Sequence, residues 1–227
     1  MNFLVCTALV FGIAYWLHRP IRKYSPLFYA LATVAAFAFG WFSFLSTAPW
    51  FKAVLYAFQR GSLSTAFFTV VMFTALFKNG TEVKKRLMSI RAELSIIGCF
   101  LALGHNLATG KTYFKALFLT PEKLSPSQLA ASVISLALIA IMLPLMVTSF
   151  RAVRQKMKPL AWKKLQRWAY PFYMLIYVHV VVLTLPLYLA GRDKYLPNLM
   201  VYTLVFMGYA IGRLIKAKSD SKRRKPA

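Results

Sequence analysis

Long apolar runs, separated by short segments rich in Lys, Arg, Gly or Pro, are the feature of this sequence that most restricts its fold. A helix needs about 17 to 25 mostly apolar residues to cross a hydrocarbon core roughly 30 Å thick. Backbone polar groups in lipid must be satisfied within each segment, and the runs lack the alternation of an outer-membrane barrel. The sequence therefore predicts an all-α, polytopic transmembrane helical bundle of about seven helices, six or seven. The predicted spans are residues 2–17, 26–45, 62–77, 90–108, 127–149, 167–190 and 197–215.

The composition excludes an ordinary soluble domain with a charged surface. Of the 227 residues, 59% are hydrophobic and only 5 are acidic. The sequence contains no Gly-rich nucleotide fingerprint and no P-loop. We therefore expect the protein to act within the membrane or together with partner proteins.

The net charge of +24 has two explanations, nucleic-acid binding and membrane topology. If the N-terminus lies outside, the inner connections and the C-terminal segment from residue 213 hold 22 Lys and Arg, and the outer connections hold 7. That asymmetry follows the positive-inside rule, with further contact between the basic tail and anionic lipid. The sequence thus predicts a multi-pass protein of the bacterial cytoplasmic membrane with a cytoplasmic C-terminus and no nucleic-acid partner.

The chain divides into three predicted parts. Residues 1–60 hold the first two spans and an outer loop, residues 61–215 form the main transmembrane domain, and residues 216–227 form a basic cytoplasmic tail. The first span has no positive charge before its apolar core, so we interpret it as an uncleaved anchor rather than a signal peptide. Cys6 and Cys99 both lie within predicted spans, where neither a disulfide framework nor a thiolate metal site is expected.

Two of the 3 histidines lie inside predicted spans. His105 follows Arg91 by 14 residues, about 21 Å along a helix, and His179 follows Arg167 by 12 residues, about 18 Å. Both spans run from inside to outside, so the two imidazoles are predicted to reach nearly the same depth on different helices. An ionisable group at that depth is costly unless it faces the bundle interior with a partner, which makes both residues candidates for function.

Three roles are compatible with the two histidines. Two neutral imidazoles facing each other across a bundle are a natural pair of axial ligands for a haem iron. Gly98 and Gly104 would then leave room for the porphyrin edge, and outer cations would meet its propionates. The outer cations that could meet the propionates are Lys111, Lys115 and Arg192. The two alternatives to haem binding are a hydrogen bond between helices and a proton relay or transport site.

His18 differs from the other two histidines because it ends the first span beside several basic residues. An interfacial side chain that snorkels toward water is expected at that place, with a ligand role as the alternative.

Two segments resemble the ferric reductase-like transmembrane domain family, and within it the MsrQ-like branch of haem-bearing membrane subunits. The first is RLMSIRAELSIIGCFLALGH, residues 86–105, and the second is TSFRAVRQKMKPLAWKKLQRWAYPFYMLIYVH, residues 148–179. The order, spacing and topology of these segments agree with the family over roughly residues 60 to 215. On this resemblance, His105 and His179 are the matching haem ligands. Gln166 stands where the family has a histidine in its L-H-R step, so one haem b is implied and a second is doubtful.

The resemblance implies that this chain transfers electrons across the membrane as the subunit of an oxidoreductase system. The donor would be a cytoplasmic flavin reductase, with FMN as a candidate cofactor, or a quinol, because the chain has no flavin domain of its own. The acceptor would be an extracytoplasmic redox protein. Inner basic residues that include Arg91 and Arg167 are candidates to receive a flavin phosphate or an acidic reductase, with topology as the alternative explanation. The remaining inner basic candidates are Arg86, Lys163 and Lys164.

The other hypothesis is a redox-inert transporter or assembly scaffold with the same helical fold.

Overall fold

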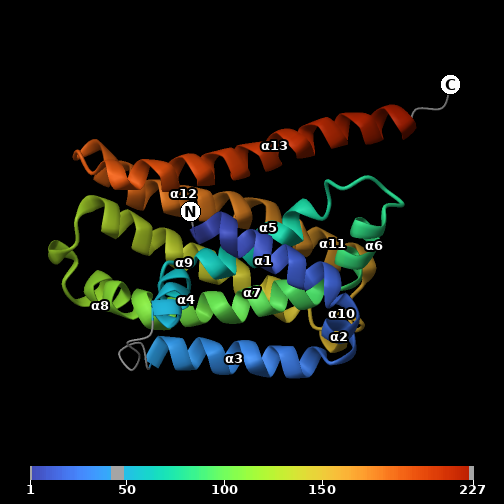
Figure 1. Ribbon diagram of the computed structural model, residues 1–227, viewed down its shortest axis with the longest axis horizontal. Coiled ribbons are helices and arrows are strands. Elements are labelled where there is room, and N and C mark those ends of the chain that lie inside the picture. Colours follow the sequence, from blue (N-terminus) through green and yellow to red (C-terminus); the bar gives the residue numbers. More distant parts are fainter. Residues whose placement is uncertain (1, 42–48, 225–227) are drawn as a thin grey trace.

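The computed structural model describes residues 2–41 and 49–224, and every regular element in this part of the chain is helical (Figure 1). The prediction of an all-α fold is confirmed. The elements are α1 (Asn2–Trp16), α2 (His18–Lys23), α3 (Ser25–Trp41), α4 (Pro49–Gln59), α5 (Ser62–Phe73), α6 (Glu82–Ser89), α7 (Arg91–His105), a π-helix (Asn106–Gly110), α8 (Lys111–Leu119), a 3-10 helix (Pro121–Lys123), α9 (Pro126–Val147), α10 (Arg151–Arg154), α11 (Pro159–Gln166), α12 (Ala169–Leu189), a second 3-10 helix (Asp193–Tyr195) and α13 (Leu196–Arg224).

Four helical segments within the described residues are long and apolar enough to cross a membrane. They are Arg91–Leu119, Pro126–Val147, Pro159–Leu189 and Asp193–Ser219. Three shorter apolar helices, Phe3–Trp16, Ser25–Ala38 and Ser62–Phe73, coincide with the first three predicted runs. The far end of predicted span 26–45 and the last residues of predicted tail 216–227 lie outside the described residues.

The short helix α5 lies inside the bundle, where it packs against α1, α4 and α7. Its 12 residues rise about 18 Å, less than the thickness of a hydrocarbon core. Most of its side chains are buried, and they include several hydroxyl groups. The hydroxyls of Ser64 and Thr69 donate to carbonyls of the preceding turn, and that of Thr74 donates to Val70 O. These bonds satisfy buried polar groups within the helix itself.

The largest hydrophobic core joins α5, α7, α9, α12 and α13 with the first turn of α1. Tyr173 is fully buried at its centre, and its ring stacks on Phe206 with the ring centroids 4.2 Å apart. The Tyr173 hydroxyl bonds the hydroxyl of Thr69 at 3.0 Å. Phe3 stacks on Tyr202 at 4.3 Å, so the N-terminal helix packs directly on the C-terminal one.

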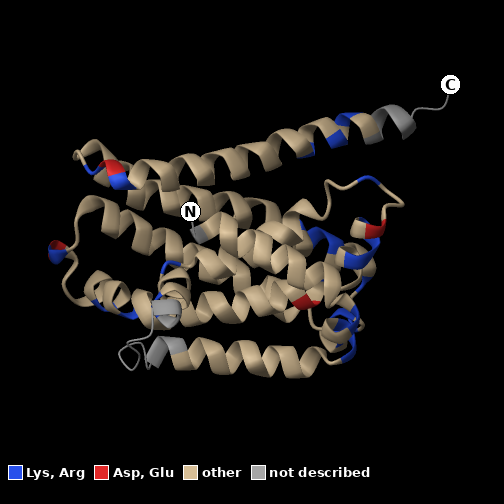
Figure 2. Ribbon diagram, viewed as in Figure 1, with Lys and Arg blue, Asp and Glu red and all other residues tan. Residues whose placement is uncertain are grey.

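Large apolar side chains remain exposed along the outer faces of the long helices, as expected for surfaces that face lipid. On α1 these include Leu9 and Ile13, on α3 Val34 and Phe37, and on α13 Leu204. Figure 2 shows Lys and Arg gathered toward the two ends of the bundle, with a broad band between that is almost free of them. We call the end that carries α2, α6, α10 and α11 the basic end.

Candidate functional site

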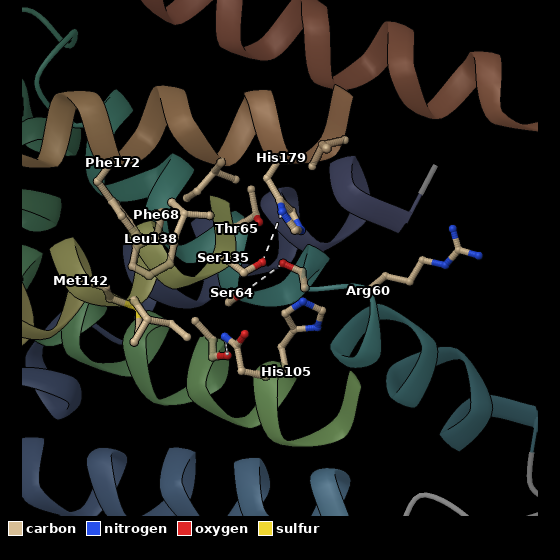
Figure 3. A pocket seen from close by; sticks show the side chains of 16 residues that line it. Arg60, Ser64, Thr65, Phe68, His105, Ser135, Leu138, Met142, Phe172 and His179 are labelled. Atoms are coloured by element: carbon tan, nitrogen blue, oxygen red, sulfur yellow. Dashed lines mark hydrogen bonds between the residues drawn. The ribbon is translucent and has the colours of Figure 1, made fainter. Parts of the chain in front are cut away.

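His105 and His179 lie on facing helices and line the same cavity. Figure 3 shows their side chains, His105 from the last turn of α7 and His179 from the middle of α12, at a smaller pocket of about 80 Å³ that both residues also line. The larger cavity, which shares both histidines with this pocket, has a volume of about 760 Å³. That volume is within the range of about 300–1,000 Å³ that is usual for ligand and cofactor sites. The structure therefore brings together the two histidines that depth counting placed at one level.

A hydrogen bond to α9 orients the His179 ring. The hydroxyl of Ser135 donates to the carbonyl of Ala131 at 2.9 Å, and its oxygen lies 3.4 Å from His179 Nδ1. Because the Ser135 hydroxyl hydrogen is used in the bond to Ala131 O, the Ser135 oxygen acts as the acceptor of a hydrogen bond from Nδ1–H of His179. The same tautomer leaves Nε2 as the unprotonated nitrogen of His179.

The position of Ser135 depends on where α9 begins. Ser125 caps this helix with a capping box: its hydroxyl accepts from the backbone N–H of Gln128, and the Gln128 side chain accepts from the backbone N–H of Ser125. This motif fixes the first turn of α9 at the mouth of the cavity, which both residues line.

His105 has a different environment, because its Nδ1 is buried without a hydrogen-bond partner among the described residues. Such an atom is costly unless something binds it. Gly61, at the start of α5, has a φ of +69° and lies against the ring. A Cβ at position 61 would lie only 3.3 Å from His105 Cδ2. Glycine therefore suits position 61 for two reasons. It adopts the left-handed backbone without strain, and its lack of a side chain leaves space for the imidazole.

The helix does not end after His105, although the sequence predicted the end of a span near residue 108. One turn of π-helix, Asn106–Gly110, connects α7 directly to α8. Gly110 has helical backbone angles and is not a terminating residue. Asn106 donates to Ala102 O at 2.8 Å, and Thr109 donates to Gln59 O at 3.0 Å. Both side chains line the cavity, and π turns are frequent at functional sites.

The cations that line the cavity differ from those expected from the sequence. Arg60 and Lys194 are among its lining residues. Arg60 also stacks over the Tyr56 ring, with the guanidinium carbon 4.6 Å from the ring centroid. The three expected outer cations, Lys111, Lys115 and Arg192, are not among the lining residues. Arg60 could have been found from the sequence, since it precedes a glycine between two apolar helices.

The two glycines of α7 have a different role from the one expected. A Cβ on Gly104 would lie 2.5 Å from Phe58 Cζ and 2.6 Å from Ala36 Cβ. A Cβ on Gly98 would lie 3.0 Å from Phe67 Cβ. The expectation that these glycines leave room for a porphyrin edge was wrong. They allow α3, α4 and α5 to pack closely against α7.

Gln166 and His18 both have local partners. The Gln166 amide donates to Thr148 Oγ1 at 3.1 Å, at the C-terminal end of α9. The His18 ring donates from Nδ1 at the start of α2 to Tyr15 O in the last turn of α1, at 3.0 Å. Neither residue lines the cavity that contains His105 and His179.

The basic candidates at the other end are distributed over separate elements. Arg91 is the first residue of α7 and is partly buried. Arg167 follows α11 and is exposed, as are Lys163 and Lys164. Arg86 forms an ion pair with Glu82 at 3.0 Å, and this hydrogen bond lowers the pKa of the Glu82 carboxyl.

Other metal-binding chemistry has little support in the described residues, among which no group of three or more His, Cys, Asp or Glu side chains could hold a metal ion. Cys6 and Cys99 are free and buried. The site therefore consists of two imidazoles in a cavity with a partly polar lining. A metal held by these two imidazoles would take its remaining donor atoms from a bound ligand.

Comparison with known proteins finds a bacterial relative that shares most of this chain. An uncharacterized protein of Treponema pallidum (strain Nichols) is 36% identical to this chain over 225 residues. The match covers 98% of this chain and 62% of that protein, so the chain spans less than two thirds of its curated relative. No protein-family model matches the chain. No solved structure matches it either.

Proposed function

We propose that this chain is a membrane protein that holds one b-type haem between α7 and α12 and passes electrons across the cytoplasmic membrane. The donor is a cytoplasmic flavin reductase or a quinol, and the acceptor is an extracytoplasmic redox protein. The chain would then be the electron-transfer subunit of an oxidoreductase system similar to the ferric reductase-like family.

The observation that carries this proposal is the meeting of His105 and His179 in one cavity of about 760 Å³. Each imidazole has a nitrogen suited to a ligand. The His179 Nδ1–H bond to Ser135 leaves Nε2 unprotonated, and the His105 ring has a buried nitrogen without a partner among the described residues. A second-sphere hydrogen bond that sets the tautomer is the usual support of a metal-binding histidine.

The residues that line the cavity would have different roles in binding the haem. His105 and His179 would hold the haem iron, and Ser135 would keep His179 in the required tautomer. Arg60 and Lys194 would neutralise carboxylates near the mouth of the cavity. Apolar side chains such as Leu138 would exclude water from the far part of the site. A haem with two histidine ligands accepts and releases single electrons.

The topology of the proposal has seven spans, an outside N-terminus and a cytoplasmic C-terminus. The support is the excess of Lys and Arg at the basic end, which by the positive-inside rule faces the cytoplasm. The cavity then lies in the outer half of the bundle. Short helices such as α5 do not cross the whole hydrocarbon core by themselves. The remaining thickness is covered by neighbouring segments or removed by local thinning of the bilayer. We propose a cytoplasmic membrane on the same grounds, and a bacterial one because the Treponema pallidum relative is bacterial.

The donor side of the proposal rests on charge alone. A flavin phosphate such as that of FMN, or an acidic reductase surface, would be attracted to the basic end, where Arg91 and the exposed Arg167 lie. A quinol would instead approach through the lipid. No second haem is proposed, because Gln166 stands at the position of the family histidine and its amide is bonded to Thr148.

The test is an absorption spectrum of the detergent-purified full chain, oxidised and reduced, together with the haem stoichiometry. We expect about one haem per chain and reduced bands that sharpen, both lost in His105→Ala and His179→Ala. His18→Ala is the matched control and should keep the pigment. Colourless protein from cells well supplied with haem would contradict the proposal and favour a redox-inert transporter or scaffold.

A further inference from the structure

Two arginines and two tyrosines meet at the basic end of α7, α12 and α13. Arg213 donates from Nη2 to Tyr170 Oη at 2.7 Å, and its guanidinium carbon lies 5.1 Å from the centroid of the Tyr170 ring. Arg91 is close enough to interact electrostatically with Tyr170, Tyr209 and Arg213. Two positive charges from separate helices are therefore held near each other by the packing of the bundle.

No carboxylate balances these two charges within residues 2–41 and 49–224. The ion pair found there joins Arg86 to Glu82, not to either of the clustered arginines. Glu93 follows Arg91 by two residues but acts electrostatically on Tyr29 of α3. Like charges that are partly removed from water repel each other, so an anion beside this pair would stabilise it.

Nearby lysines have other uses. Lys216 donates to the carbonyls of Ala75 and Phe77 at 2.6 and 2.9 Å, just beyond the end of α5. Lys84 also donates to Phe77 O, at 3.1 Å. These cations satisfy the last carbonyls after a helix, which is a common structural role. The guanidinium of Arg213 is instead directed to a tyrosine hydroxyl, beside Arg91.

The Tyr209 hydroxyl is a second and independent indication of a ligand. The residue is 4% exposed, and its hydroxyl has no hydrogen-bond partner in the part of the chain that the structure describes. Its ring is held by Tyr173 and Phe73, with centroid distances of 5.1 and 5.6 Å. A buried hydroxyl is normally paired, so an unpaired one beside two guanidinium groups suggests a missing acceptor.

The surface beside this cluster is apolar. Ile211, Leu214 and Ile215 of α13 are exposed, as is Trp168 before α12. In Figure 1, α13 lies beside α12 and its C-terminal part extends beyond the end of that helix. A ligand with an anionic group and hydrocarbon chains could place the anion on the arginines and the chains on these side chains.

We propose that Arg91 and Arg213, with the hydroxyls of Tyr170 and Tyr209, bind the phosphate group of an anionic phospholipid. Guanidinium groups match the geometry of phosphate oxygens, and basic pockets between transmembrane helices bind lipid headgroups on the cytoplasmic side. A soluble phosphate shares this chemistry but lacks the acyl chains. The site lies at the opposite end of the bundle from His105 and His179, and it does not depend on whether a haem is bound.

Native mass spectrometry of the detergent-purified full chain tests the proposal, with phosphatidylglycerol, phosphatidylcholine and inorganic phosphate as separate probes. We expect phosphatidylglycerol to remain bound at least about 10-fold more tightly than phosphatidylcholine, as a charge-assisted contact implies. Arg91→Gln and Arg213→Gln should remove this preference. Arg22→Gln is the matched control, since Arg22 is an exposed arginine of α2 at the same end.

Tyr209→Phe keeps the test interpretable if an arginine variant does not fold. It removes only the unpaired hydroxyl, so the protein should fold normally and bind phosphatidylglycerol several-fold more weakly. Binding of inorganic phosphate that depends on the same residues, and exceeds that of the lipid, would overturn the assignment to lipid. Equal lipid binding by the parent, Arg213→Gln and Arg22→Gln would overturn the site itself.

Discussion

The Ser135 hydroxyl oxygen lies 3.4 Å from His179 Nδ1, and the same hydroxyl donates to the Ala131 carbonyl at 2.9 Å. The direction of these two bonds determines the tautomer of His179. The Ser135 hydroxyl and the Ala131 carbonyl of α9 thus favour a proton on Nδ1 of His179 and leave Nε2 available to a ligand in the cavity.

Replacing Ser135 by alanine should weaken haem binding by about 10- to 100-fold, the usual effect of losing a partner that orients a metal-binding histidine. Haem titration followed by absorbance measures the change. Ser149→Ala is the matched control, because the Ser149 hydroxyl likewise donates to the carbonyl four residues earlier, Leu145 O, at 2.7 Å, and Ser149 does not line the cavity. Equal haem affinity in the Ser135 and Ser149 variants would show that the hydrogen bond has no influence on the site.

Gly61→Ala should displace His105 and reduce the haem content of the purified protein. Its Cβ would lie 3.3 Å from His105 Cδ2, at a backbone φ of +69°. The left-handed backbone alone costs roughly 1–2 kcal/mol for a residue with a side chain. Gly80→Ala separates the two effects, because Gly80 has a φ of +86° and its added Cβ would meet no atom within 4 Å. Both variants should unfold at lower temperature, but only the Gly61 variant should lose pigment.

Gly104→Ala should destabilise the bundle by about 1–3 kcal/mol, the range for inserting a methyl group into a packed core. The added carbon would lie 2.5 Å from Phe58 Cζ and 2.7 Å from the Ala36 Cα, which is backbone and cannot move alone. Thermal unfolding in detergent measures the effect. Gly208→Ala provides the comparison, because it meets no atom within 4 Å and should be neutral or up to about 1 kcal/mol more stable. An unchanged unfolding temperature for Gly104→Ala would mean that α3 and α7 are not packed as described.

Arg60→Gln should reduce haem retention by about 10-fold, since a charge-assisted hydrogen bond contributes roughly 1.5–3 kcal/mol. Arg60 lines the cavity, whereas Lys115 is exposed and is not one of the lining residues. Lys115→Gln removes the same charge and should leave retention unchanged. Competition with apomyoglobin for the bound haem gives the rates of loss. A larger effect at Lys115 than at Arg60 would favour the arrangement first expected from the sequence.

Much of the helical framework follows from local properties of the sequence. The four long candidate spans and three shorter apolar helices overlap the predicted runs, although one long segment continues to Leu119, past the predicted end at residue 108. The overlap arises because hydropathy and backbone satisfaction are local constraints. The same kind of local count predicts a similar depth for His105 and His179, and the structure places both residues at one cavity. The count depends only on the rise per residue and on the basic residue that begins each segment.

The details of the site depend on packing between distant segments and were less predictable. The position of Gly104 beside His105 suggests space for a cofactor, but Ala36 and Phe58 fill that space. The partner of His179 is a serine of α9, and nothing in the sequence near either residue indicates the contact. Arg60 lies in a predicted outer loop, but only the structure shows that the turn between α4 and α5 borders the cavity.

The π turn after His105 has a consequence for the segment that follows it. Such a turn contains one residue more than an α-helical turn, and each residue of an α-helix advances the face by about 100°. The faces of α8 are therefore rotated relative to an uninterrupted continuation of α7. Deleting one residue between Asn106 and Gly110 would restore the regular register, keep both helices, and swing Tyr113 and Phe114 away from the cavity wall that they now form.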